Sequence, residues 1–277
     1  MKLLVTLSRS LALACIVGLT AAGPAPAQPA KEYEPKVGQQ GKDVIWVPTP
    51  QALVDKMLDM AKVTPQDYVV DLGSGDGRTV ITAAKRGAKA LGIEYNPDMV
   101  ELSKRNAAKE GIGEKAKFVK ADIFETDFSE ATVVTLFLLP SLNVRLRPKL
   151  LEMKAGTRVV SNSFDMGEWT PDETVEGVEG CTSYCRAHFW IVPAKVAGSW
   201  QTAQGELTLA QTFQVVSGTL KSGNVIAPIA NGKLAGDRIA FTAGGTQYSG
   251  KVSGNAIEGI SKTGASEASW RATRGGK

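Results

Sequence analysis

The stretch that decides the fold is Tyr68-Val69-Val70-Asp71-Leu72-Gly73-Ser74-Gly75-Asp76-Gly77. Its first five residues are mostly β-branched, aromatic or leucine, which predicts a short buried strand ending at Leu72. Three glycines follow at alternate positions, and helical composition runs from Thr79 to Lys85. Glycine lets a ligand approach the backbone closely, and a helix N-terminus presents free amides. The stretch therefore predicts a ligand-binding turn between a strand and a helix.

Two further predicted strands also end in an acid. Residues 90–94 finish at Glu94, about 20 residues after the first glycine, and residues 117–122 finish at Asp122. The carboxyl ends of parallel strands meet at one edge of a sheet, where open α/β sheets bind their ligands. A carboxylate at the end of the second strand can accept hydrogen bonds from both ribose hydroxyls. Asp71, Glu94 and Asp122 together predict a site for a nucleotide-like ligand.

The glycine spacing separates two kinds of ligand. A dinucleotide site has the pattern G-x-G-x-x-G, whereas this chain has G-x-G-x-G, with Asp71 two residues before the first glycine. An acid beside the turn attracts an ammonium or sulfonium group and repels phosphates. The sequence favours a ligand that carries an ammonium and a sulfonium group over the alternative, a nicotinamide dinucleotide.

Residues 71–77 with Glu94 and Asp122 resemble the successive binding motifs of class I S-adenosylmethionine-dependent methyltransferases, and the resemblance covers about residues 47 to 193. It implies S-adenosylmethionine as cofactor. The implied binding residues are Gly73, Gly75 and Gly77 beside the methionyl part, Glu94 on the ribose, and Asp122 with Ile123 at the adenine. It also implies an α/β fold, a Rossmann-like seven-stranded mixed sheet with helices on both faces. Its antiparallel last strand is assigned to residues 186–192.

Within this class the chain is most similar to seven-stranded protein-lysine methyltransferases. Residues 47–50, 71–78, 137–140 and 158–161 resemble stretches of the mitochondrial ATP synthase c-subunit lysine methyltransferase family. The resemblance implies a protein lysine as methyl acceptor. The leader and the tail over 196–277 depart from that family, so another protein group or a small molecule stays open as acceptor.

The acceptor end is expected after the fourth predicted strand, residues 132–139. Many amino methyltransferases carry an Asn- or Asp-Pro-Pro motif there, but this chain has Leu139-Pro140. With Phe137 these residues either wall a dry channel for a lysine stem or pack in the core. Candidates for polar and aromatic contacts at the channel mouth, or for ordinary loop and cap positions, are Asn143, Ser163, Asp165 and Trp169. No catalytic base is named, because a sulfonium already activates the methyl group and transfer needs positioning above all.

The chain divides into four predicted parts. Lys2 and Arg9 precede an apolar run and the small residues Ala25-Pro26-Ala27, which predicts a signal peptide over residues 1–27. Residues 28–46 are expected to be a flexible lead-in, residues 47–194 the S-adenosylmethionine-binding domain, and residues 195–277 a separate β domain. The apolar run is too short to predict a stable membrane span. A helix is predicted from a Thr49 cap to about Lys62.

Export and cofactor supply conflict. Cleavage near Ala27 predicts a periplasmic protein, whereas S-adenosylmethionine is made in the cytosol. Three solutions stay open: the leader does not function and the protein is cytoplasmic, the cofactor reaches the compartment, or the site binds something else. In the last case the chain is an exported non-catalytic binding protein with a degenerate nucleotide site.

Two cysteines remain after cleavage. Cys181 and Cys185 either form a disulfide in an oxidising compartment or stay reduced. No metal site is predicted, because there is no second cysteine pair and His188 is the only histidine. The single histidine also argues against a Ser-His-Asp hydrolase, and we expect it to pack within a strand.

The tail over residues 195–277 has a different pattern. Short alternating apolar runs separated by glycine, asparagine and aspartate predict an antiparallel β meander or half-barrel. It either recruits a partner, binds a small ligand or covers the other domain. The formal net charge of +4 gives no case for nucleic acid or a membrane surface as partner. The oligomeric state is not predicted.

Overall fold

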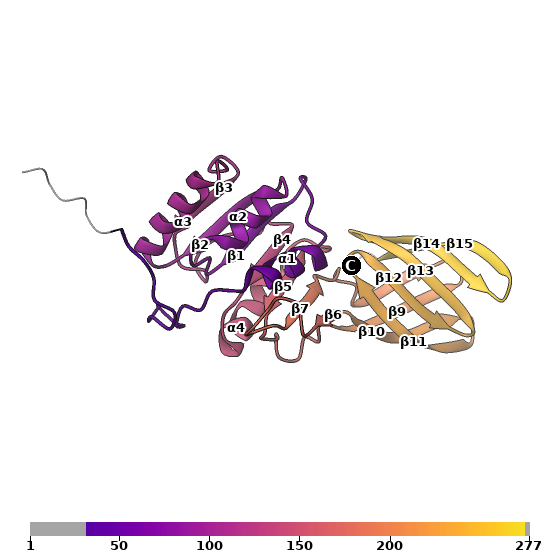
Figure 1. Cartoon of the computed structure of the whole chain (residues 1–277). Helices are drawn as coiled ribbons and strands as arrows, with labels where there is room; N and C mark the ends of the chain where they lie inside the picture. The colour runs from indigo at the N-terminus through magenta and orange to yellow at the C-terminus, as the bar shows by residue number, and fades with distance from the viewer. Residues whose placement is uncertain (1–31, 275–277) are drawn as a thin grey trace, which may run out of the picture. The chain divides into compact units, whose positions relative to one another are not determined.

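The computed structural model describes residues 32–274, so the signal peptide predicted over residues 1–27 lies outside the described part. Figure 1 shows an α/β region followed along the chain by a region built only of strands. Within residues 32–274, the helices fall short of the length and apolar character that crossing a membrane requires. The predicted order of an α/β domain and a β domain is confirmed.

The α/β region contains one mixed sheet. Its strands are β1 (Tyr68–Leu72), β2 (Lys89–Glu94), β3 (Ala116–Lys120), β4 (Val133–Leu136), β5 (Arg158–Asn162), β6 (Glu173–Val175) and β7 (Ala187–Ile191). They lie in the order β3-β2-β1-β4-β5-β7-β6. The pairs from β3 to β5 are parallel, and β7 is antiparallel to both neighbours. The antiparallel strand predicted over residues 186–192 is therefore confirmed.

Alternation along the strands gives the sheet two apolar faces. Val69 belongs to one buried cluster and its neighbour Val70 to another, and Val160 and Val159 divide in the same way. Successive side chains of a strand point to opposite faces of the sheet, so neighbouring residues of a buried strand join different clusters. Both faces of the sheet therefore need a cover of helices.

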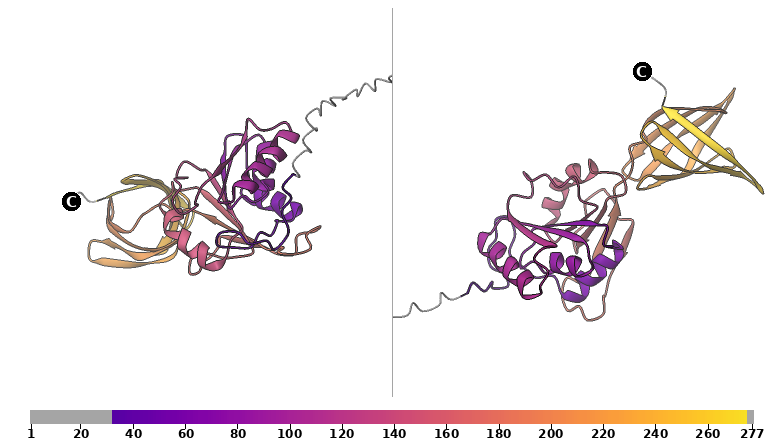
Figure 2. Two further views of the ribbon diagram at one scale, coloured as in Figure 1. Left: turned by 90° about the vertical axis from the view of Figure 1, so that its left-hand side faces the viewer. Right: turned by 90° about the horizontal axis from the view of Figure 1, so that it is seen from above.

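In the described part of the chain, residues 32–274, four helices cover these faces. They are α1 (Gln51–Met60), α2 (Arg78–Lys85), α3 (Pro97–Lys109) and α4 (Pro140–Leu151). The first three contribute to the cluster with Val69, and α4 contributes to the other cluster. In the right-hand view of Figure 2, α4 lies across the sheet from the indigo and purple helices. The predicted arrangement of helices on both faces is confirmed.

Three expected local features differ from the structure. Thr49 does not cap α1: the N-cap position is Pro50, and the Thr49 hydroxyl accepts a hydrogen bond from Asn162 Nδ2 at 3.2 Å. Strand β4 ends at Leu136 rather than at Leu139, and Leu139 is the N-cap residue of α4. Strand β6 was not predicted, since its three residues have two exposed members and no apolar alternation.

The strands of the tail close into a barrel. They are β8 (Gly198–Thr202), β9 (Gly205–Thr212), β10 (Val215–Ser222), β11 (Val225–Ala235), β12 (Arg238–Ala243), β13 (Thr246–Ser253), β14 (Ala256–Thr263) and β15 (Ser266–Arg274). The meander is as expected, but the half-barrel is corrected to a closed barrel, because β15 pairs with β8 and β9 pairs with β10.

Side chains fill the interior of the barrel. The ring of Phe241 stacks on Tyr248 with centroids 4.9 Å apart, and Trp270 meets both rings edge-on. Trp200 is fully buried in the same cluster. An eight-stranded barrel is just wide enough for its interior to be filled in this way. The barrel is therefore a packed domain.

Candidate active site

The glycine turn is tied to the end of β2. The amides of Gly73 and Ser74 both donate to the carbonyl oxygen of Ile93, at 2.9 and 3.1 Å. All three glycines of the turn have positive φ, 79° at Gly73, 55° at Gly75 and 84° at Gly77. A side chain rarely adopts this conformation, so the motif is required by the backbone path. The turn leads directly into α2.

Close packing explains two of the glycines further. A Cβ atom at Gly75 would lie 2.7 Å from Nε1 of Trp46, and one at Gly77 would lie 2.8 Å from the ring of Phe118. Gly77 is the N-cap residue of α2 and lies outside the cavity lining. Its predicted role beside the methionyl part is thus replaced by packing, whereas Gly73 and Gly75 line the cavity.

Asp71 lies buried below the turn, with a side chain that is 6% exposed. Its Oδ1 accepts a hydrogen bond from Thr135 Oγ1 at 2.7 Å. Burial raises the pKa of Asp71 to about 7. The hydrogen bond from Thr135 lowers this pKa, whereas the nearby Glu94 and Asp76 carboxylates raise it further. The site thus holds a carboxyl group that titrates near neutral pH and gains from a positively charged ligand.

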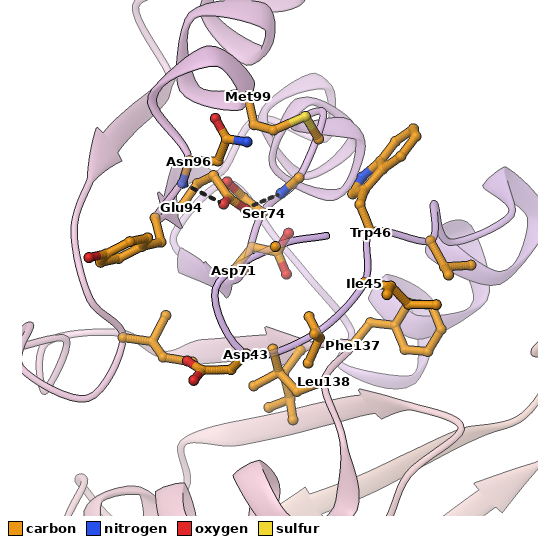
Figure 3. A pocket seen from close by; sticks show the side chains of 18 of the residues that line it. Asp43, Ile45, Trp46, Asp71, Ser74, Glu94, Asn96, Met99, Phe137 and Leu138 are labelled. Atoms are coloured by element: carbon orange, nitrogen blue, oxygen red, sulfur yellow. Dashed lines mark hydrogen bonds between the residues drawn. The ribbon is translucent and has the colours of Figure 1, made fainter. Parts of the chain in front are cut away.

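Glu94 is held by the backbone on both sides. Its Oε2 accepts from the amide of Gly75 at 3.0 Å, and its Oε1 accepts from the amide of Asn96 at 2.9 Å. Figure 3 shows Glu94 beside Asn96 and Met99 at one end of a cavity. Each oxygen keeps lone-pair capacity for a further donor. This is the orientation that a ribose-binding carboxylate needs.

The segment expected to be a lead-in forms one wall of the cavity. Gln39 and Trp46 exchange a backbone hydrogen bond of 2.8 Å, and Gly41 and Val44 another of 2.9 Å, so residues 39–46 form a small hairpin. In Figure 3 its backbone passes across the cavity. The indole ring of Trp46 packs beside Gly75 of the glycine turn. Residues 44–47 are β-rich and follow a glycine-containing turn, which was an available signal for this hairpin.

The hairpin is linked to the acid after β3. Lys42 Nζ pairs with Asp122 Oδ2 at 2.5 Å and lies 4.9 Å from the centre of the Tyr95 ring. The hydrogen bonds from Lys42 and from the amide of Phe124 lower the pKa of Asp122. Asp122 and Ile123 both line the cavity, as the sequence predicts.

These elements enclose a cavity of about 410 Å³, within the range of small-molecule sites. The end near β2 is polar, with Glu94 and Asn96, and the opposite end carries Phe137 and Leu138 (Figure 3). Asp71 and Ser74 lie between these ends. Apolar and aromatic lining residues that complete the second end are Ile45, Leu139, Leu142, Phe164 and Tyr184.

Four of the acceptor candidates fall in different places. Leu139 lines the cavity and is 41% exposed, while Pro140 starts α4 and is exposed outside the lining. Asn143 is fully buried and donates to the carbonyl oxygens of Phe164 and Asp165, so it shapes the loop after β5. Trp169 is fully buried against Trp190 and does not reach the cavity, contrary to expectation. The large apolar ring of Trp169 packs within the core.

Three residues that carry weaker sequence signals also have clear positions. His188 lies in β7, with Nδ1 hydrogen-bonded to Thr174 Oγ1 at 2.9 Å, and burial lowers its pKa. This confirms the expectation of a packed strand histidine. Cys181 and Cys185 are joined by a disulfide, and the loop that they close brings Tyr184 to the cavity. Sequence spacing allowed the disulfide but gave no sign of where Tyr184 would lie.

Comparison with known proteins agrees with this geometry. The sequence model of the family described as ANTKMT methyltransferase domain matches residues 71–173. A protein-lysine N-methyltransferase of Saccharolobus islandicus is 48% identical over 140 residues, which are 50% of this chain and 87% of that protein. The ATP synthase c-subunit lysine N-methyltransferase of Rattus norvegicus is 41% identical over 118 residues, 42% of this chain and 55% of the rat enzyme.

A solved structure shares both fold and sequence. The crystal structure of an RNA methyltransferase from Salinibacter ruber with S-adenosyl-L-homocysteine covers 54% of this chain and 96% of its own, with 49% identity and a TM-score of 0.51. Sheet order, glycine turn and ribose acid together define a class I S-adenosylmethionine-dependent methyltransferase. The chain belongs to the family of the Saccharolobus islandicus protein-lysine N-methyltransferase, and its residues 71–173 match the ANTKMT methyltransferase domain.

The cavity fits S-adenosylmethionine, the cofactor of this class. Ser74 lines the cavity, and its Oγ is buried without a hydrogen-bond partner among the described residues, so this residue has capacity for a ligand group. Glu94 would hold the ribose hydroxyls, Asp71 would face the ammonium, and Asp122 with Ile123 would border the adenine. The cofactor supplies a methyl group already activated by a sulfonium.

The pKa of Asp71 predicts how cofactor affinity depends on pH. The ionised carboxylate attracts the ligand ammonium, so protonation below about pH 7 weakens binding. Between pH 8 and pH 6 we expect the affinity for S-adenosylhomocysteine to fall about tenfold, measured by calorimetry. Thr135→Val removes a bond that favours the carboxylate and should move the profile to higher pH. A flat profile over this range would contradict the role of Asp71.

Proposed function

We propose that this methyltransferase transfers the methyl group to the ε-amine of a protein lysine. The observation that carries the proposal is the aromatic end of the cavity, where Phe137, Phe164 and Tyr184 lie together. A lysine stem of four methylene groups packs well against such a surface. The rings also attract an ammonium group as it arrives.

The same surroundings prepare the amine for reaction. An apolar environment disfavours the charged form and so lowers the pKa of the incoming lysine, which gives the neutral nucleophile. The only histidine lies in β7 outside the cavity lining, so the imidazole does not serve as a base. The chain's contribution is to align the amine with the methyl group and to exclude water.

The names of the relatives support a lysine acceptor and also suggest RNA as the main alternative. Two of them are named lysine methyltransferases, and the Salinibacter ruber protein is named an RNA methyltransferase. Around the mouth, Ile45, Leu139 and Tyr184 are exposed apolar or aromatic side chains, between 41% and 52% exposed. Phosphate binding needs a basic surface, which these residues do not provide. The rim therefore favours an amine on an apolar stem over RNA.

Methylation assays with two acceptors test the proposal. The protein with labelled S-adenosylmethionine is incubated with a lysine-containing peptide and, separately, with an RNA oligonucleotide. We expect label on the lysine and a mass increase of whole methyl groups. Labelling of the RNA and not of the peptide would overturn the proposal.

Variants of two glutamates serve as a matched pair. Glu94→Ala removes the ribose acid and should lower kcat/KM at least about tenfold, since hydrogen bonds to charged groups are worth about 1.5–3 kcal/mol. Glu101→Ala changes an exposed glutamate of α3 that pairs with Lys104 and should leave the rate within about twofold. Equal losses in both variants would contradict a specific role for Glu94.

We infer that the protein acts after export. The charged and apolar leader over residues 1–27 supports this, and the Cys181–Cys185 disulfide suits an oxidising compartment. Fractionation of cells that produce the full chain is expected to place a shortened protein in the periplasmic fraction. A full-length protein in the cytoplasmic fraction would exclude export.

A further inference from the structure

Three aromatic rings from separate parts of the chain form a row at the acceptor end. Phe137 follows β4, Phe164 follows β5, and Tyr184 lies in the loop before β7. The ring centroids of Phe137 and Phe164 are 6.1 Å apart in a stacked pair, and those of Phe137 and Tyr184 are 5.2 Å apart edge-on. These separations are typical of favourable aromatic pairs. Tyr184 is the outermost ring, with 46% of its surface exposed.

The loop that carries Tyr184 is restrained at both ends. Cys181 and Cys185 are joined by the disulfide, with Cα atoms 5.6 Å apart. Cys181 is partly buried and packs against the core cluster of α1 and α2. Its amide N–H donates a hydrogen bond to the carbonyl oxygen of Val178. The disulfide therefore ties the residue after Tyr184 to a fixed point on the core.

The backbone of Tyr184 is itself unusual. Its φ is 53°, in the left-handed region that bulky side chains rarely occupy. A residue is kept in this region only when its surroundings determine it, and such residues gather at binding sites. Here the closed loop provides the restraint, and the result is a ring aimed at Phe137 on the wall of the cavity.

We propose that Tyr184, held over the cavity by the Cys181–Cys185 loop, is a specificity-determining residue that forms the outer wall of the acceptor channel. This inference rests on the proposed function and states which part of the chain selects the acceptor. With Tyr184 in place, the channel admits an amine on a long unbranched apolar stem and shields that stem from water. The residues assigned to the cofactor, Asp71 and Glu94, lie on other segments, so a change at Tyr184 leaves those two side chains in place.

Kinetic constants of three variants test the proposal. In Tyr184→Ala and in the double variant Cys181→Ser/Cys185→Ser, KM for a lysine peptide should rise about three- to tenfold, the size of one aromatic contact. Affinity for S-adenosylhomocysteine should stay within about twofold in both, which also shows that each variant is folded. Tyr184→Phe keeps the ring and should keep KM. An unchanged KM in Tyr184→Ala, or a parallel loss of cofactor affinity, overturns the proposal.

Reduction tests the contribution of the disulfide within the native sequence. Dithiothreitol gives two electrons and two protons to the disulfide, which becomes two thiols while the reagent closes to its own cyclic disulfide. In the wild-type protein this should raise KM as far as the double cysteine variant does, and in that variant it should change nothing. An unchanged wild-type KM after complete reduction would show that the disulfide does not hold Tyr184.

A binding measurement separates this inference from the lysine proposal. The probe is a bisubstrate analogue, S-adenosylhomocysteine with nitrogen in place of sulfur and an aminobutyl arm on that nitrogen. Tyr184→Ala should lower affinity for the analogue about three- to tenfold but leave affinity for S-adenosylhomocysteine unchanged. This result would support the channel even if no lysine peptide is methylated. Equal affinities of Tyr184→Ala and the wild-type protein for the analogue would overturn the proposed role of Tyr184 in the acceptor channel, even if lysine peptides are methylated.

Discussion

The two hydrogen bonds from the amides of Gly73 and Ser74 to the carbonyl oxygen of Ile93 fix the glycine turn to the end of β2. Because of this link, the amide of Gly75 meets the Glu94 carboxylate, which directly follows Ile93. The same turn closes over Asp71 and starts α2. The polar end of the cavity thus follows from one backbone junction between neighbouring parallel strands.

Burial of Asp71 shows how function opposes stability at this junction. Its pKa of about 7 in the folded chain is raised above the ordinary value of 3.8. The folded state therefore binds the proton of Asp71 more tightly than the unfolded state does. The resulting contribution to the free energy of unfolding is complete below the ordinary pKa and is lost as the pH rises through 7. A ligand ammonium supplies the missing counter-charge. Binding and folding are coupled at this carboxyl group, and the ligand-free protein is the less stable state at neutral pH.

The sequence predicted those parts of the molecule that depend on local pattern. Buried strands such as residues 68–72 show as apolar runs, and glycine spacing with strand-end acids identified the polar half of the site. The aromatic half was found only in part, because Phe164 and Tyr184 reach Phe137 through tertiary contacts between distant segments. Trp169 was misplaced for the same reason: its type suits a binding site as well as a core, and the core packing decided.

Two other differences have a shared physical cause. The hairpin over residues 39–46 has a local signal in residues 44–47, but its position on the cavity wall depends on pairing of Lys42 with Asp122 and on packing of Trp46 against Gly75. The barrel closes because β8, the first strand of the tail, pairs with β15, the last. Both depend on partners far away in sequence, which residue patterns within one segment do not encode.

The central claim is that one cavity joins a cofactor end at Glu94 to an acceptor end at Phe137 and Tyr184. A crystal structure of the protein with S-adenosylhomocysteine tests it most directly. The account predicts the ribose hydroxyls on Glu94, the ammonium facing Asp71, and the sulfur directed to the aromatic rings. A ligand bound elsewhere, or one whose sulfur points away from Phe137 and Tyr184, would contradict it.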